Sequence, residues 1–337
     1  MSAAAILPWQ HDLWRIVGEA RDQQRLAHAL LLAGPAGVGK RTFASALTQT
    51  LLCEAPAAGG YACRVCRSCV QFAAGSHPNL FWLRPLVDDK TDKQKRDISV
   101  EQLRDMGDKL VLSAHYGGAK VAVLDPADAL NTNGVNALLK TIEEPPPNTY
   151  LLLISERPMA LAATLRSRCQ RLRFSPPSSD EAQAWLQQQE PVLTGALLEH
   201  ALTSSQGAPL RALAAHRSGL LDLQRKWRSD WLDVAAQKRP PTAAAVAVGK
   251  DREQVSAWLS AFIVFLAELL RVRVSGQPSA DIGAIAVRIA PSGLQALIDE
   301  AHESARRITT SASPQLVVES LMIAWWRWSM ARGAAAR

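Results

Sequence analysis

The stretch ALLLAGPAGVGKR, residues 29–41, decides the fold. Its first five residues form an apolar run of strand length, and residues 42–47 after it have a helical pattern. A glycine-rich turn between a buried strand and a helix is the context of a phosphate-binding loop, where backbone N–H groups and the helix N-terminus surround an anion. The residues predicted to hold phosphate are Gly34, Gly37, Gly39 and Lys40.

One residue of this loop departs from the pattern. A Ser or Thr normally follows the lysine, because its hydroxyl binds the Mg²⁺ of the nucleotide. Here Arg41 follows, and its guanidinium has no acceptor atom and repels a cation. The loop, Arg41 included, is therefore predicted to hold phosphates but to be poorly suited to splitting them.

A second departure lies at the end of another predicted strand, residues 120–124. Asp125 follows this strand, where P-loop NTPases carry the acid that holds Mg²⁺ directly or through water. The glutamate that polarises water in hydrolysing ATPases would come next, but the chain has Pro126, which cannot accept a proton. Ser155, after the apolar run 150–154, is either a polar sensor beside a γ-phosphate or a strand-end hydroxyl.

The order of the predicted elements indicates an α/β fold followed by helices. Apolar strands alternate with helical patterns up to about residue 175, which is typical of a parallel sheet covered by helices on both faces. After a Pro- and Ser-rich segment only helical patterns follow. We expect a P-loop domain over residues 1–175, a small helical group over 176–217 and a longer helical domain over 218–337.

Four of the five cysteines gather in an insertion at about residues 53–69. Four thiolates at this spacing suit a closed tetrahedral Zn²⁺ site, which predicts a structural role because no ligand position is left open for chemistry. Iron–sulfur proteins use similar spacing, and unrelated reduced thiols are a third interpretation. The predicted ligands are Cys53, Cys63, Cys66 and Cys69.

Composition indicates a soluble cytoplasmic protein without a membrane span. No signal peptide is apparent at the N-terminus, and the longest apolar run, residues 257–267, is shorter than the roughly 18 residues that suggest a span. The net charge of +7 favours polyanion partners, although surplus Lys and Arg are more often a solvated surface. Residues 257–270 are apolar nearly all round, so we expect burial on all sides, with other subunits as natural neighbours.

Three further sites have both a functional and a structural interpretation. Arg168 is either a surface residue or an arginine finger that reaches the γ-phosphate of a neighbouring subunit. Glu143 and Glu144 are interpreted as the solvated end of a helix that Pro145 stops, rather than as a catalytic pair. His77 is interpreted as a structural turn residue rather than a ligand.

Together these residues resemble the bacterial sliding-clamp loader family of AAA+ proteins, and within it the delta-prime subunits of DNA polymerase III. The most specific marks are the cysteine insertion behind the phosphate loop, HPN at 77–79, NALLKTIEEPP at 136–146 and LRSRC at 165–169. The resemblance covers the N-terminal domain strongly and the rest only by length and helical character. It implies an AAA+ P-loop domain with a zinc-binding insertion, a helical lid and an all-α C-terminal collar.

By the same resemblance, the collar assembles a ring with gamma or tau motor subunits and with delta, the hetero-oligomer that loads the sliding clamp onto primed DNA. The chain would be a stationary scaffold without catalytic activity of its own within the polymerase holoenzyme, and Arg168 would complete a neighbour's ATP site. Whether ATP or ADP occupies the loop without hydrolysis stays open. The alternative is an ATP-hydrolysing motor, which should have Ser or Thr at 41, Glu at 126 and Arg at 210. A P-loop kinase for small molecules is a weaker alternative, because no substrate lid or base is found.

Overall fold

The computed structural model describes six stretches of the chain, residues 6–88, 93–112, 118–249, 251–276, 282–308 and 312–330. The chain divides into two compact units. One comprises Met1–Gln189 and Gly207–Arg211, and the other comprises Glu190–Gln206 and Ala212–Arg337. The finer division into three domains stays a prediction.

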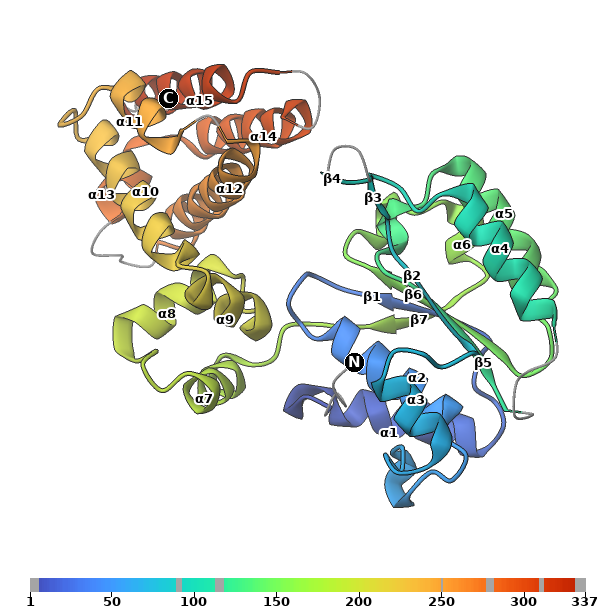
Figure 1. Ribbon diagram of the computed structural model, residues 1–337. Coiled ribbons are helices and arrows are strands. Elements are labelled where there is room, and N and C mark those ends of the chain that lie inside the picture. The colour runs from blue at the N-terminus through green and yellow to red at the C-terminus, as the bar shows by residue number, and fades with distance from the viewer. Residues whose placement is uncertain are drawn as a thin grey trace. The chain divides into compact units, whose positions relative to one another are not determined.

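The first unit alternates strands and helices from its N-terminus to α7 (Figure 1). Short 3₁₀ turns occur at Pro8–Gln10, Ala58–Gly60, Ala127–Ala129 and Pro158–Ala160. Its strands are β1 (Ala29–Ala33), β2 (Leu80–Leu83), β3 (Val87–Asp88), β4 (Lys93–Gln94), β5 (Lys120–Leu124), β6 (Thr149–Ser155) and β7 (Gln170–Arg173). Its helices are α1 (His11–Asp22), α2 (Lys40–Leu52), α3 (Arg67–Ala73), α4 (Val100–Val111), α5 (Thr132–Glu143), α6 (Ala163–Arg166) and α7 (Ser179–Gln189).

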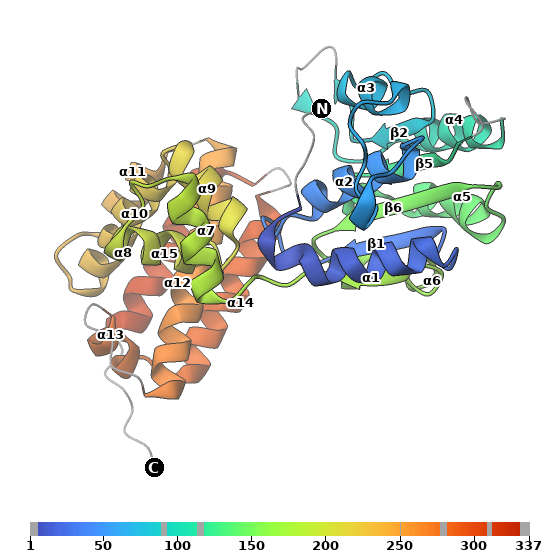
Figure 2. The same ribbon diagram turned by 90° about the horizontal axis from the view of Figure 1, so that it is seen from below.

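Five of these strands form one parallel sheet in the order β2-β5-β6-β1-β7, and β3 pairs with β4 in a short antiparallel ribbon. Side chains of a strand alternate between the two faces of a sheet. Leu30 and Leu32 of β1 therefore pack with α1, α2 and α3, whereas Leu31 packs with α4, α5 and α6 on the other face. The views in Figures 1 and 2 show these two helical layers. The prediction of a parallel sheet covered on both faces is confirmed.

Local sequence signals account for where several helices begin. Ser99 caps α4 because its hydroxyl accepts a hydrogen bond from Gln102 N, and Ser99 N donates to Gln102 Oε1, which completes a capping box. At the start of α5, the Asn131 side chain accepts from Gly134 N and serves as the N-cap. These caps satisfy N–H groups that have no partner within the helix.

The second unit is entirely helical within its described residues. Helix α9 (Pro209–Arg217) lies across the boundary, and the others are α8 (Gly195–Ser204), α10 (Leu220–Ala235), α11 (Pro241–Val248), α12 (Arg252–Ser275), α13 (Gly283–Arg288), α14 (Pro291–Arg307) and α15 (Pro314–Met330). An aromatic cluster of Trp231, Trp258, Phe262, Phe265 and Trp325 fills its core. The Trp325 indole N–H donates to Trp231 O at 2.9 Å, so its polar atom is satisfied inside the core.

Helix α12 is the only described helix that is long and apolar enough, by length and composition, to cross a membrane. Core helices have the same composition, and Trp258, Phe262 and Phe265 of α12 belong to the core of the unit. The described residues do not bury α12 on all sides, because Ala257 and Ile263 are half-buried and Ala267 is exposed. One face of α12 is thus accessible among the described parts of the chain.

Candidate functional site

The phosphate loop between β1 and α2 is packed closely against its own unit. A Cβ on Gly34 would overlap the carbonyl oxygen of Phe174, the residue after β7, so this position has no room for a side chain. Gly37 has a φ of +78° and lies against the backbone of Arg211, and its carbonyl accepts a bond from Leu210 N at 3.1 Å. Both glycines are therefore required by packing or by backbone conformation.

The segment before α1 binds the same loop from another side. Trp9 Nε1 donates to Val38 O at 3.0 Å, and Gln10 Nε2 donates to Val38 O at 3.1 Å and to Gly39 O at 3.0 Å. Gly39, with a φ of +92°, is the N-cap of α2. The carbonyl groups at the end of the loop are thus satisfied by the chain itself.

The head group of Lys40, the predicted phosphate ligand, is turned back onto the loop. Its Nζ donates to Gly34 O at 2.6 Å and to Pro35 O at 2.5 Å, and the residue is only 4% exposed. Burial lowers the pKa of Lys40, an effect that the charge of Glu156 partly opposes. To reach a phosphate, this ammonium group would have to exchange two hydrogen bonds that it already makes.

Asp125 is fully buried and both of its carboxylate oxygens are bound to cations. Arg41 Nε donates to Oδ1 at 2.7 Å, and Arg84 donates to Oδ2 from Nη2 at 2.9 Å and from Nε at 3.1 Å. The indole N–H of Trp82 donates to the same oxygen at 3.3 Å. A buried carboxylate needs such partners. The arginine at the position of the missing metal-binding hydroxyl thus lies on the acid that was predicted to hold the metal.

Arg84 and Trp82 are site residues that the sequence did not reveal. Leu83 of β2 pairs with Leu124 of β5 in the parallel register, so the next residues, Arg84 and Asp125, leave the sheet side by side. The available signal was that each of them directly follows an apolar strand. It could be used only with the knowledge that these two strands are neighbours in the sheet.

Ser155 is brought to the same edge of the sheet, but its hydroxyl is engaged. Ser155 Oγ donates to Asp128 Oδ1 at 2.7 Å, and the backbone N–H of Glu156 donates to Asp128 Oδ2 at 2.6 Å. Asp128 thereby fixes the chain that leaves β6. The geometry agrees with a strand-end hydroxyl and leaves the sensor role a prediction.

The four insertion cysteines converge after the C-terminal end of α2. Their Sγ atoms all lie within 4.8 Å of one another, and those of Cys53 and Cys66 are 3.9 Å apart. A tetrahedral ion with Zn–S bonds of about 2.3 Å separates its sulfur ligands by about 3.8 Å. Backbone N–H groups of Val65 and Cys66 lower the pKa of the Cys63 thiol to about 6. The cluster can hold a metal ion, and its compactness suits a single ion better than an iron–sulfur cluster.

His77 connects this insertion to the core by a chain of hydrogen bonds. The Ser68 hydroxyl donates to Leu52 O, the last residue of α2, and accepts from His77 Nε2 at 2.7 Å. His77 Nδ1 accepts from Asn79 N at 3.1 Å, so the neutral ring with its proton on Nε2 satisfies every contact. Burial lowers the pKa of His77 in agreement with this neutral form. The prediction of a structural turn residue agrees with this geometry.

Arg168 lies after α6 and forms an ion pair. Its Nε is 2.7 Å from Glu143 Oε1 at the end of α5, and its side chain is 41% exposed. Glu143 is half exposed, as predicted, but it is not free in solvent. Cys169, the fifth cysteine, is half-buried away from the cysteine cluster, and burial raises the pKa of its thiol to about 11.

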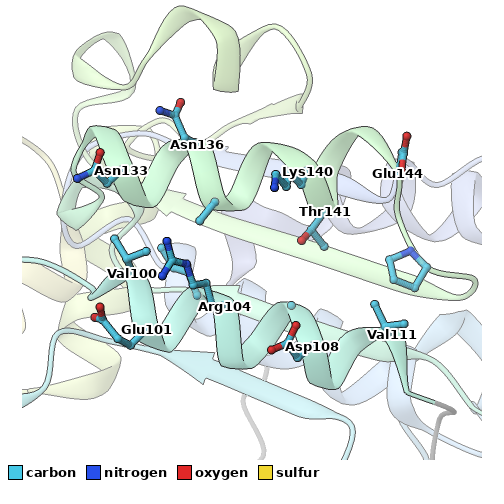
Figure 3. A pocket seen from close by; sticks show the side chains of 14 residues that line it. Val100, Glu101, Arg104, Asp108, Val111, Asn133, Asn136, Lys140, Thr141 and Glu144 are labelled. Carbon is cyan, nitrogen blue, oxygen red and sulfur yellow. The ribbon is translucent and has the colours of Figure 1, made fainter.

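An open cleft of about 870 Å³ is lined by α4 and α5, whose apolar sides pack in the same core (Figure 3). Arg104 of α4 and Thr141 of α5 lie in the space between the two helices. Its charged residues are of both signs, namely Glu101, Arg104, Asp108, Lys140 and Glu144. This mixture favours no ligand of a single charge, and none of these residues belongs to the phosphate loop.

Comparison with known proteins gives consistent matches to one family. Residues 9–178 match the family model described as DNA polymerase III, delta subunit. The chain is 43% identical over 64% of its length to DNA polymerase III subunit delta' of Pseudomonas aeruginosa and 33% identical over 77% to that of Haemophilus influenzae. The first match spans 63% of its relative's length and the second 76%.

Solved structures are matched at lower similarity. A DNA polymerase III gamma subunit-related protein of Thermotoga maritima has 13% identity and a TM-score of 0.43, over 95% of this chain and 99% of that one. A RuvB mutant of the same organism has 17% identity and a TM-score of 0.41, over 91% of this chain and 85% of that one.

Proposed function

Because the chain belongs to the family of DNA polymerase III delta-prime subunits, we propose that it is a non-hydrolysing scaffold of the clamp loader. Its partners in this proposal are gamma or tau motor subunits, delta and, through the assembled ring, the sliding clamp and primed DNA. The proposed location is the cytoplasm, where replication takes place in bacteria. The helical second unit, with its accessible α12 face, is the proposed collar.

The observation that carries this proposal is the state of Asp125. A motor subunit needs this carboxylate for Mg²⁺, yet here Arg41 and Arg84 bind its two oxygens. Pro126 stands where the water-polarising glutamate belongs, and Lys40 binds the loop's own carbonyl groups. Any ATP or ADP that enters this loop is bound without hydrolysis. These features favour the scaffold over the alternative, an ATP-hydrolysing gamma- or tau-like motor.

The contribution of the chain to catalysis is proposed to lie on its surface. Arg168 is partly exposed after a short helix, so its guanidinium is accessible to a neighbouring subunit. An arginine finger supplied in trans stabilises the charge that develops on a transferring phosphoryl group. In this proposal, Arg168 stabilises that charge in the ATP site of the adjoining motor subunit.

The four-cysteine cluster is proposed to bind a structural zinc ion. Cys53, Cys63, Cys66 and Cys69 would supply four thiolates, which complete a tetrahedral shell and leave no position for substrate. Hydrogen bonds from backbone N–H groups of the insertion to these sulfurs support the metal-binding form. The ion would hold together a segment that has few apolar side chains of its own.

The test is ATP hydrolysis by the reconstituted loader with Arg168→Ala in this chain. Removing an arginine finger slows ATP hydrolysis at the site that it completes by about 10³–10⁵-fold. Turnover of the whole ring should therefore fall by the fraction that this one site contributes. Lys40→Ala in this chain should leave turnover unchanged. Turnover that survives Arg168→Ala but is lost with Lys40→Ala would show a motor instead.

A further inference from the structure

Glu143 and Arg168 join two segments of the first unit, the end of α5 and the turn after α6. Arg168 Nε lies 2.7 Å from Glu143 Oε1, and Arg168 Nη1 donates to Thr164 O at 3.0 Å. The two side chains are 47% and 41% exposed, respectively. The guanidinium is thus held at two points while it stays open to solvent.

These two contacts use only part of the donor capacity of Arg168. An arginine carries five N–H groups, and one of the two on Nη1 donates to Thr164 O. The contact of Nε with Glu143 is an ion pair rather than a hydrogen bond. Within the described stretches of the chain, the other N–H groups of Nη1 and Nη2 make no hydrogen bond. They are the donors that an approaching anion can meet.

We propose that Glu143 is a positioning residue for Arg168, an inference that rests on the function proposed above. Glu143 binds the Nε side of the guanidinium and so presents the Nη side to the phosphate of the neighbouring subunit. A long side chain loses rotamer freedom when it docks, and holding it in its docked orientation beforehand reduces that loss. Glu143 itself does not touch the nucleotide.

The size of the effect follows from the exposure of the pair. Exposed ion pairs contribute little to folding stability, so replacing Glu143 leaves the fold intact. The same weak interaction changes the population of the oriented arginine by about two- to fivefold. The expected change is therefore a small fraction of the loss caused by removing the finger.

The experiment compares variants of this chain in the reconstituted loader. Glu143→Ala should lower kcat for ATP about two- to fivefold and leave KM unchanged, because the finger acts on the transition state. Glu143→Asp keeps the carboxylate charge and should recover part of the rate. Glu144→Ala, which removes the same charge one residue further along, is the matched control and should leave the rate unchanged.

The double variant separates this inference from the proposed function. Glu143→Ala should have no further effect when Arg168→Ala is already present, because a positioning residue acts only through the residue that it holds. If Arg168→Ala alone left turnover intact, the proposed function and this inference would both fail. If Arg168→Ala lowered turnover but Glu143→Ala resembled Glu144→Ala, only this inference would fail.

A measurement on the isolated chain tests the ion pair without any partner. In nitrogen-15 NMR relaxation, the Nε–H bond vector of Arg168 should be restrained, and Glu143→Ala should increase its mobility whereas Glu144→Ala should not. Equal mobility in all three proteins would overturn the inference.

Discussion

The two ends of helix α2 carry sites of opposite kinds. At its N-terminal end the charged side chains of a phosphate loop are engaged by the chain, with Lys40 on loop carbonyls and Arg41 on a buried carboxylate. After its C-terminal end four thiols lie within 4.8 Å of one another and could hold a metal ion. The lysine and the acid of the first site thus have partners within the chain, whereas the second site has the spacing of a metal shell. The partners that the polar atoms of a site already have therefore indicate ligand binding better than resemblance to a ligand-binding motif does.

Metal removal is the change with the largest expected effect on this comparison. Structural zinc contributes about 10–16 kcal/mol of apparent binding free energy in small modules, so chelation should unfold the cysteine insertion while the sheet remains folded. Hydrogen exchange should show lost protection over residues 53–75 and retained protection at Phe43 and Leu47, which are packed in the core.

Metal analysis supplies the matched test. The unaltered chain and Cys169→Ser should each contain one zinc ion, whereas Cys66→Ser should contain none. An iron-rich brown protein, or equal zinc in all three, would contradict the assignment of these four ligands.

Freeing Asp125 should have the next largest effect. Arg41→Thr with Pro126→Glu restores two motor residues but leaves Arg84 bound to Asp125, so Mg²⁺ should still not bind. Adding Arg84→Gln should make ATP affinity depend on Mg²⁺, by about tenfold or ~1.4 kcal/mol. Isothermal titration with and without Mg²⁺ measures this difference. Equal affinities in the triple variant would mean that the arginines are not what closes the site.

The smallest expected effect is a pH dependence at the other end of α2. Burial lowers the pKa of His77 from its ordinary value of 6.5, although the charge of Glu54 partly opposes the shift. As the pH falls, the unfolded chain therefore binds a proton at His77 more readily than the folded chain does. The contribution of His77 to stability is complete above pH 6.5 and decreases as pH falls from there through the lowered value.

Chemical denaturation of the unaltered chain and of His77→Gln between pH 8 and pH 5.5 checks this prediction. Protonation of cysteine thiols weakens metal binding in both proteins, so only the difference between them reports His77. The variant should lose less stability on acidification. Parallel curves would show that His77 does not titrate in this range.

The sequence predicted elements and isolated residues better than it predicted their pairing. Local signals were sufficient for the apolar strands β1, β5 and β6 and for helix α2, whereas α3 and the short ribbon of β3 and β4 were not predicted. The contact of Arg41 with Asp125 depends on strand order, which no local signal reveals, so these two residues were not identified as each other's partners. Glu143 was interpreted as solvated for the same reason, because Arg168 comes from another segment.

Gly34 has a consequence for how such chains are recognised in genomes. Its place against the Phe174 carbonyl excludes any side chain, and this exclusion does not depend on whether a nucleotide is present. Selection on folding alone is therefore enough to preserve a glycine of the fingerprint after the chemistry is gone. A genome survey that counts ATPases by this fingerprint will include members that do not hydrolyse ATP. The residue paired with the strand-end aspartate offers a way to distinguish these members from true ATPases.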